Sequence, residues 1–132
     1  MTRRQTYSTG TKYEEEFGFN RAVRVGETIR IAGTAAVDEG EVVAPGDPYE
    51  QAKFVLERIE GSLDAVGASM DDVLITRVFV EEFDIWQGIG RAHREGFSGD
   101  KPASTMIGVD SLPEEDLLLE IEAEAVVDTE EG

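Results

Sequence analysis

The sequence has 132 residues, with no cysteine, one histidine, one tryptophan and only three lysines. Without cysteine the chain can form neither a disulfide nor a thiolate nucleophile. The single histidine, His93, has no cysteine, histidine or aspartate close to it in the sequence, so we predict no metal site. The glycines do not form a phosphate-binding loop, and we predict no cofactor.

Among the charged residues of the chain, acidic residues are in large excess. The chain carries 29 Asp and Glu residues against 12 Lys and Arg, for a formal charge of -17. Such a charge destabilises a compact state by self-repulsion unless salt screens it, and in molar salt the Debye length falls to about 3 Å. Because the acids are spread along the chain, we favour a halophilic protein over an ordinary acidic one. The same charge argues against a nucleic-acid partner.

The length predicts a single domain over residues 1–132, large enough to bury a core without disulfides or metals. No stretch approaches the length of a membrane span, so we expect no membrane partner. The N-terminal residues lack the apolar run of a secretion signal. We therefore expect a soluble, cytoplasmic protein.

Apolar periodicity predicts several strands and two helices. The first helix begins after Asp47, a good N-cap followed by Pro48 at the first helical position, and ends at Gly67. The second helix follows Asp84 and places Trp86 on its apolar face, as a core residue. Strands are predicted over residues 4–7, 22–25, 28–35, 41–43, 73–80, 105–109 and 117–125.

The order of these elements, strands, helix, strand, helix and strands, predicts an α+β fold. In this fold one sheet carries both helices on a single face. We expect the other face to carry apolar residues such as Val78, Val80 or Leu119. Because an uncovered apolar face implies a partner, we expect the chain to oligomerise.

Five segments of the sequence form a recognisable pattern when they are taken together and in order. The segments are Phe-Asn-Arg-Ala-Val at 19–23, Ile-Ala-Gly at 31–33, the first helix with Leu56 and Ile59, Arg-Val-Phe-Val at 77–80, and a C-terminal block from Pro-Ala-Ser-Thr at 102–105 through Leu-Pro at 112–113 to Glu-Ile-Glu-Ala at 120–123. This pattern resembles the RidA/YjgF family. The resemblance implies a chorismate-mutase-like fold, a homotrimer, and small-molecule clefts between subunits. It also implies a function, because the best-known members hydrolyse reactive imines.

The largest departure from the family pattern concerns the arginine that clamps the substrate carboxylate. By the resemblance it falls on Ser104. A charge-assisted hydrogen bond contributes roughly 1.5 to 3 kcal/mol, and neither Ser104 nor Thr105 can supply that charge. Arg21 and Arg91 are candidate replacement cations, although a lone arginine is more often a surface residue.

Other functional positions of the family are also changed. The resemblance places a tyrosine of the family on Phe19, a serine on Ala32, just before Gly33, and an asparagine on Gly90. One acid is kept, since Glu120 matches the glutamate that positions the hydrolytic water. Taken alone, the alternating glutamates around Glu120 favour a solvated strand face.

Two functions remain open at this point. The first is a hydrolytic deaminase of small enamines or imines, in which Glu120 directs water and an inter-subunit cleft binds the substrate. The alternative is a non-catalytic trimer of the same family that binds a small metabolite, since Ser104 replaces the arginine. Some family members are labelled endoribonucleases, and the charge argues against that activity here.

Overall fold

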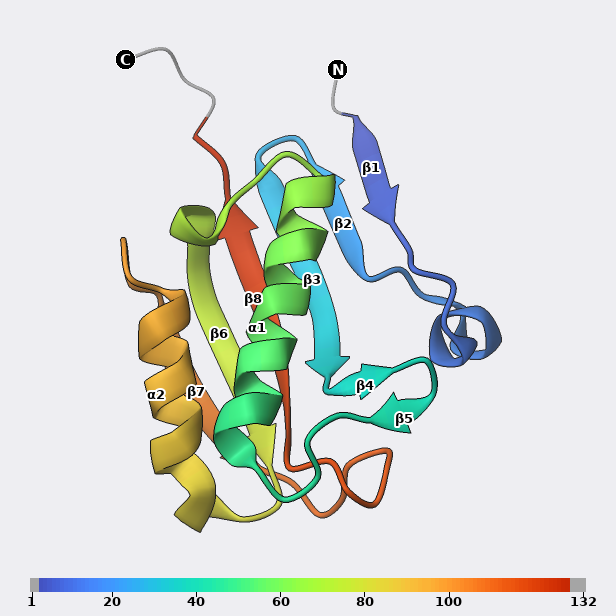
Figure 1. Ribbon diagram of the computed structural model, residues 1–132. Coiled ribbons are helices and arrows are strands. Elements are labelled where there is room, and N and C mark those ends of the chain that lie inside the picture. The colour runs from blue at the N-terminus through green and yellow to red at the C-terminus, as the bar shows by residue number, and fades with distance from the viewer. Residues whose placement is uncertain (1–2, 129–132) are drawn as a thin grey trace.

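The computed structural model describes residues 3–128. They form a six-stranded sheet with two helices on one face (Figure 1), which confirms the α+β fold class. In spatial order the strands are β1 (Arg4–Tyr7), β2 (Ala22–Val25), β3 (Thr28–Ala35), β8 (Leu119–Val126), β6 (Val73–Val80) and β7 (Ala103–Gly108).

The sheet is mixed. Strands β6 and β7 pair in parallel, and the other neighbouring strands pair antiparallel. Strands β1 and β7 lie at the two edges. Short elements complete the fold: the two-stranded hairpin β4 (Val37–Asp38) and β5 (Glu41–Val42), a π-helical turn η1 (Glu14–Gly18), and the 3-10 turns η2 (Met70–Asp72) and η3 (Phe83–Ile85).

The two helices, α1 (Pro48–Ala65) and α2 (Trp86–Gly96), pack against each other on the same face of the sheet (Figure 1). Asp47 caps α1, because its carboxylate accepts a 3.0 Å hydrogen bond from the N–H of Glu50. Gly67 follows the end of α1 with φ of 82°, a left-handed conformation that terminates helices. Both ends of this helix agree with the sequence prediction.

The prediction that Val78, Val80 and Leu119 lie on the uncovered face is wrong. These three side chains are at most 3% exposed and belong to the core under the helices. Side chains alternate between the two faces of a strand, so Arg77 and Phe79 point the other way. A strand that reads as apolar on both faces does not reveal which face receives the helices.

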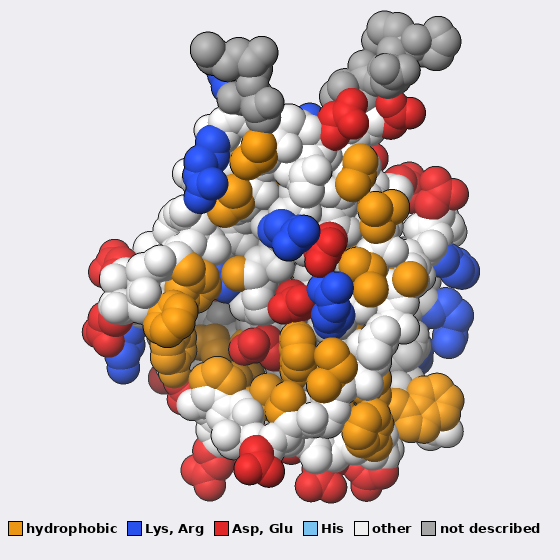
Figure 2. Space-filling model, turned by 180° about the vertical axis from the view of Figure 1, so that it is seen from behind, with side chains coloured by type: hydrophobic (Ala, Val, Ile, Leu, Met, Phe, Trp, Pro, Cys, Tyr) orange, Lys and Arg blue, Asp and Glu red, His pale blue; other side chains and the backbone are white. Residues whose placement is uncertain are grey.

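The open face of the sheet, the one without helices, carries ion pairs. Arg77 lies 2.9 Å from Glu122 and 3.1 Å from Glu124, and Arg30 lies 3.5 Å from Glu124. Figure 2 shows acidic and basic side chains at the middle of this face, with hydrophobic side chains around them. The open face is therefore mixed in character, and it is not the apolar surface that we expected.

Trp86 is not a core residue, contrary to the prediction. Its side chain is 55% exposed, whereas Ile89 and Phe97 on the same helical stripe are buried. Trp86 is the first residue of α2, and in Figure 1 this helix lies in front of the edge strand β7. Within residues 3–128, no helix is long and apolar enough to cross a membrane.

Candidate functional site

The residues that the sequence singled out fall into two groups on opposite sides of the sheet. The first group surrounds Glu120, whose side chain lies on the open face. The second lies between β7 and α2, on the helix side. Thr105 alternates with Ser104 along β7 and so points toward the open face. The first group contains Phe19, Arg21, Ala32, Gly33 and Glu120, and the second contains Gly90 and Ser104.

A β-bulge in β3 makes room for the carboxylate of Glu120. The register of β3 against β8 shifts between Ile31 and Thr34, so Ala32 and Gly33 form the irregularity. A Cβ atom on Gly33 would lie 2.5 Å from Oε1 of Glu120, closer than non-bonded atoms approach. A larger residue would therefore displace the Glu120 carboxylate, and the bulge is of the kind often found beside active sites.

Glu120 is half-buried, and burial raises the pKa of its carboxyl above the usual range. The positive charge of Arg21 opposes this rise. No hydrogen bond from the described part of the chain reaches the Glu120 carboxylate. An ionised carboxylate with free lone pairs and a raised pKa can accept a proton from a bound water molecule.

Arg21 is a partly buried residue beside Glu120, although a lone arginine is usually exposed. Its side chain is 16% exposed, and its Nη2 donates a 2.8 Å hydrogen bond to the carbonyl oxygen of Gly33. Its Nε lies 3.7 Å from a carboxylate oxygen of Glu14 but forms no hydrogen bond. The guanidinium also lies 5.1 Å from the ring of Phe19, within cation–π range. Arg21 thus connects Glu14, the bulge and Glu120.

Glu14 also belongs to the group around Glu120, because it lies beside Arg21, and the sequence analysis did not identify it. Its carboxylate accepts hydrogen bonds from the hydroxyls of Ser8 (2.6 Å), Thr9 (2.6 Å) and Thr11 (2.7 Å), and from the N–H of Thr9 (2.8 Å). Burial would raise the pKa of Glu14, but these hydrogen bonds outweigh it and hold the pKa at about 2. Glu14 is therefore a fixed negative charge that orders the loop before β2 and positions Arg21.

Arg91, the other candidate cation, does not reach either group. Its guanidinium lies 4.1 Å from the ring of Tyr49, and its Nε lies 3.4 Å from Glu95. Its side chain is 58% exposed, as expected for a surface arginine. Among the residues that the structure describes, no cluster of three or more His, Cys, Asp or Glu side chains is arranged to hold a metal ion.

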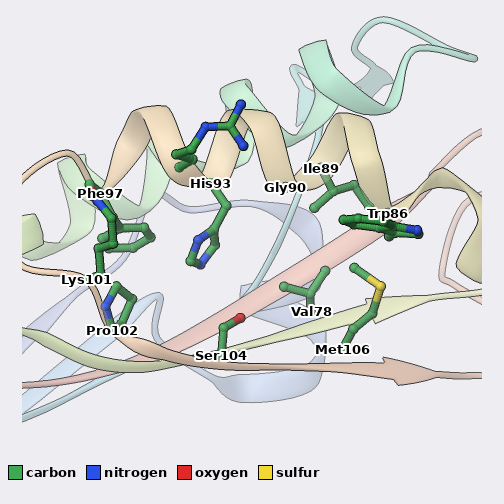
Figure 3. A pocket seen from close by; sticks show the side chains of 11 residues that line it. Val78, Trp86, Ile89, Gly90, His93, Phe97, Lys101, Pro102, Ser104 and Met106 are labelled. Atoms are coloured by element: carbon green, nitrogen blue, oxygen red, sulfur yellow. The ribbon is translucent and has the colours of Figure 1, made fainter.

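A cavity of about 400 Å³ lies between α2 and β7, with α2 above it and the two strands β6 and β7 below (Figure 3). Its volume is within the roughly 300 to 1,000 Å³ typical of small-molecule sites. Gly90 and Ser104 both line it. Most of its walls are apolar, formed by Val78, Trp86, Ile89, Phe97, Pro102 and Met106.

A chain of hydrogen bonds joins two residues that line this cavity, His93 and Ser104, through the buried Thr76. The hydroxyl of Thr76 donates to Oγ of Ser104 at 2.8 Å, and its oxygen lies 2.9 Å from Nε2 of His93. In this arrangement Nε2 of His93 carries the hydrogen that Thr76 accepts. Burial lowers the pKa of His93, so the imidazole is neutral near pH 7. The hydroxyl of Ser104 is thus part of an uncharged, hydrogen-bonded chain of side chains under α2.

Comparison with known proteins agrees with this fold. A protein-family model described as Endoribonuclease L-PSP matches residues 10–127. The chain belongs to this family. A RutC family protein of Pyrococcus abyssi is 36% identical over 80% of this chain and 83% of its own. An uncharacterized protein of Streptomyces coelicolor is 33% identical over 89% of this chain and 87% of its own.

A solved structure extends the match. A Mycobacterium tuberculosis protein of the YjgF/YER057c/UK114 family is 34% identical and covers 95% of this chain and 100% of its own, with a TM-score of 0.86. The RidA/YjgF resemblance is therefore confirmed. In the present chain, the family resemblance singled out Glu120, whereas no local pattern indicated Thr76, which is buried in a strand of mostly apolar residues.

Proposed function

We propose that this L-PSP family protein is a hydrolytic deaminase of small reactive imines and enamines, acting in clefts between the subunits of a homotrimer. The observation that carries the proposal is the carboxylate of Glu120. It is half-buried, receives no hydrogen bond from the described residues, and has a raised pKa. These are the properties of a general base that activates water near neutral pH.

The proposed reaction uses one water molecule. Glu120 accepts a proton from the water as the oxygen attacks the imine carbon, and it delivers this proton to the nitrogen, which takes up the electron pair of the C=N π bond. The resulting carbinolamine then breaks its C–N bond as its hydroxyl proton passes to the nitrogen, so ammonia leaves, a carbonyl product remains and Glu120 is again ionised. Enamines enter after protonation at carbon gives the imine. Arg21 favours the ionised form of Glu120 without being consumed.

The division of the site supports a cleft shared between copies of the chain, as in the proposed homotrimer. Glu120 and Ser104 lie on opposite faces of one sheet, so one small ligand inside a single chain does not contact both. A second copy that sets its open face against β7 and α2 would bring the two groups together. The large negative charge of such an assembly provides a test of it. Three copies carry a formal charge of -51, three times -17, so the trimer should dissociate as salt is removed.

Sedimentation from molar to low KCl measures this dissociation. We expect trimers in molar KCl and smaller species at low salt. A monomer at every KCl concentration would contradict the inter-subunit cleft.

Ammonia release from freshly generated 2-iminopropanoate and 2-aminoacrylate in multimolar KCl tests the chemistry. We expect the wild type to accelerate release and Glu120→Gln to lose at least about 100-fold of that acceleration. Glu122→Gln is the matched control, because Glu122 lies on the same strand and face but is paired with Arg77. Equal activity in the two variants would remove Glu120 from the mechanism.

Binding without turnover is the second candidate function. It is favoured by Ser104, which lacks the charge of the family arginine and whose hydroxyl is already bonded to Thr76. A trimer that binds small molecules but does not accelerate ammonia release would support it. RNA cleavage, which the family description names, is less well supported. The protein is strongly acidic, and Arg30 and Arg77 on the open face are paired with glutamates.

A further inference from the structure

The cavity between α2 and β7 differs in charge from the rest of the molecule. Acidic residues outnumber basic ones 29 to 12 in the chain. The cavity lining nevertheless includes two basic residues, Arg94 and Lys101, and no aspartate or glutamate. In a protein of this charge, such a lining makes the cavity a local region that favours an anionic ligand.

Lys101 is held at one end of the cavity. Its Nζ donates a 3.1 Å hydrogen bond to the carbonyl oxygen of Phe97, which directly follows the end of α2. A cation is favoured at this end of a helix, where the unpaired carbonyl groups concentrate negative charge. A lysine ammonium has three hydrogens, so two remain available to a ligand.

The opposite end of the cavity is apolar. In Figure 3, Lys101, Phe97 and Pro102 lie at one end, and Trp86 and Met106 lie at the other. Between the two ends, the neutral chain through Ser104 adds hydrogen-bonding groups without charge. The cavity therefore has Lys101 at one end, neutral hydrogen-bonding groups in the middle and apolar side chains at the other end, with Arg94 as a second cation in its lining.

We propose that this cavity selects small carboxylates with a branched or aromatic apolar body, and that Lys101 binds the carboxylate. The apolar body lies between Trp86 and Met106. Lys101 thereby supplies the charge that Ser104 cannot supply. This inference rests on the proposed function, for which it assigns Lys101 as the residue that binds the carboxylate and predicts a preference for substrates with an apolar side chain.

The single tryptophan provides a direct measurement. Trp86 is the sole tryptophan of the chain and lines the apolar end of the cavity, so its fluorescence reports occupancy without any turnover. The probes are 4-methylpentanoate, its neutral amide 4-methylpentanamide, and acetate, none of which absorbs at the excitation wavelength. We expect the carboxylate to bind about tenfold more tightly than the amide, because a hydrogen bond to a charged group adds roughly 1.5 kcal/mol or more. Acetate, which lacks the apolar body, should bind more weakly than 4-methylpentanoate.

Substitution of Lys101 tests the charge itself. We expect Lys101→Gln to lower the affinity for 4-methylpentanoate about tenfold and to leave that for the amide unchanged. Lys101→Arg should retain most of the preference. Lys53→Gln is the matched control, because Lys53 is an exposed lysine on α1 outside the cavity. Equal affinities for carboxylate and amide in the wild type would overturn the proposal, as would equal behaviour of the Lys101→Gln and Lys53→Gln variants.

The binding and hydrolysis experiments can fail separately. Carboxylate binding that depends on Lys101, without ammonia release, would leave the cavity assignment intact and remove the hydrolase. Ammonia release that depends on Glu120, without the Lys101-dependent preference, would keep the hydrolase and remove this substrate class. If circular dichroism shows that the Lys101→Gln variant is unfolded, the comparison of carboxylate with amide binding to the wild type still tests the preference for a carboxylate.

Discussion

On the open face of the sheet the half-buried and buried polar groups are ions, whereas under α2 they are neutral. Glu14, Arg21 and Glu120 place two carboxylates and a guanidinium close together, with Arg21 between them. On the other side, His93 and Ser104 are joined by the hydroxyl of Thr76, and each of these groups is uncharged near pH 7. The two sides of one sheet thus offer a ligand different chemistry.

The difference follows from what each arrangement costs. A buried ion requires partners that compensate for lost hydration, and Glu14 obtains them from the loop that it orders. A neutral hydroxyl chain has a smaller desolvation cost and leaves the cavity wall mostly apolar. The ionic side is therefore suited to moving a proton, and the neutral side to recognising the body of a ligand.

The largest predicted effect comes from removing the buried charge of Glu14. We expect Glu14→Gln to lower the free energy of unfolding by about 3 kcal/mol at pH 7, because a pKa of about 2 in place of 4.5 is a stabilisation of that order. The folded-state pKa is depressed, so this contribution is present above about pH 4.5 and is lost as the pH falls toward 2. Urea unfolding of both proteins across this pH range measures it.

Glu15→Gln is the control for this prediction, because Glu15 is an exposed neighbour on the same turn. It should be close to wild type at every pH. A Glu14→Gln protein whose deficit is as large at pH 2 as at pH 7 would show that the loop, and not the charge, provides the stability.

The second prediction concerns the bulge at Gly33. In Gly33→Ala the new methyl group would contact Oε1 of Glu120 and displace the carboxylate. The carboxylate is the end of a flexible side chain, so we expect a stability cost of only about 1 kcal/mol. Activity should fall about 100-fold, as for a catalytic group misplaced by about 1 Å. Ammonia release and thermal unfolding, measured on the same samples, separate the two effects.

Gly61→Ala gives the matched control, since a Cβ at Gly61 on α1 meets no atom within 4 Å. Alanine is a better helix former than glycine, so this variant should be more stable by up to about 1 kcal/mol and fully active. Loss of activity in both variants would point to a general sensitivity to substitution.

Local patterns in the sequence located the two helices and most of the strands, but not β4 or the π-helical turn η1. Alternation along β8 correctly separated Glu120 from the core residues Leu119 and Ile121, and the Asp47 cap correctly placed the start of α1. The same reasoning failed for Val78, because a strand with apolar residues on both faces does not indicate which face the helices cover.

The remaining part of the site depends on contacts that no local pattern encodes. The hydrogen bonds of Thr76 reach 17 residues to His93 and 28 residues to Ser104. They form because parallel pairing places Thr76 opposite Ser104, and because α2, which carries His93, packs above the strands. The five hydrogen bonds to the Glu14 carboxylate require a specific loop conformation, although their donors lie close to it in sequence.

A third, smaller effect is expected from breaking the neutral chain at its centre. Thr76→Val keeps the shape of the side chain but removes the bonds to both His93 and Ser104, for a cost of about 1 to 2 kcal/mol. The His93 ring should also lose its protected Nε2–H signal in nitrogen-15 NMR spectra. Thr105→Val on the exposed side of β7 should change stability by less than about 0.5 kcal/mol. An unchanged His93 spectrum in Thr76→Val would show that the chain does not fix the imidazole.

The smallest effect should come from the end of the chain at Ser104. Ser104 is exposed, so in Ser104→Ala a water molecule can accept the hydrogen bond from Thr76, and we expect a cost of about 0.5 kcal/mol. A double-mutant cycle of Ser104→Ala with Thr76→Val measures how strongly the two hydroxyls depend on each other. A coupling energy near zero would mean that Ser104 only borders the cavity. A coupling as large as the whole effect of Ser104→Ala would mean that Thr76 holds this hydroxyl in place, which is the arrangement that a ligand between Lys101 and Trp86 would contact.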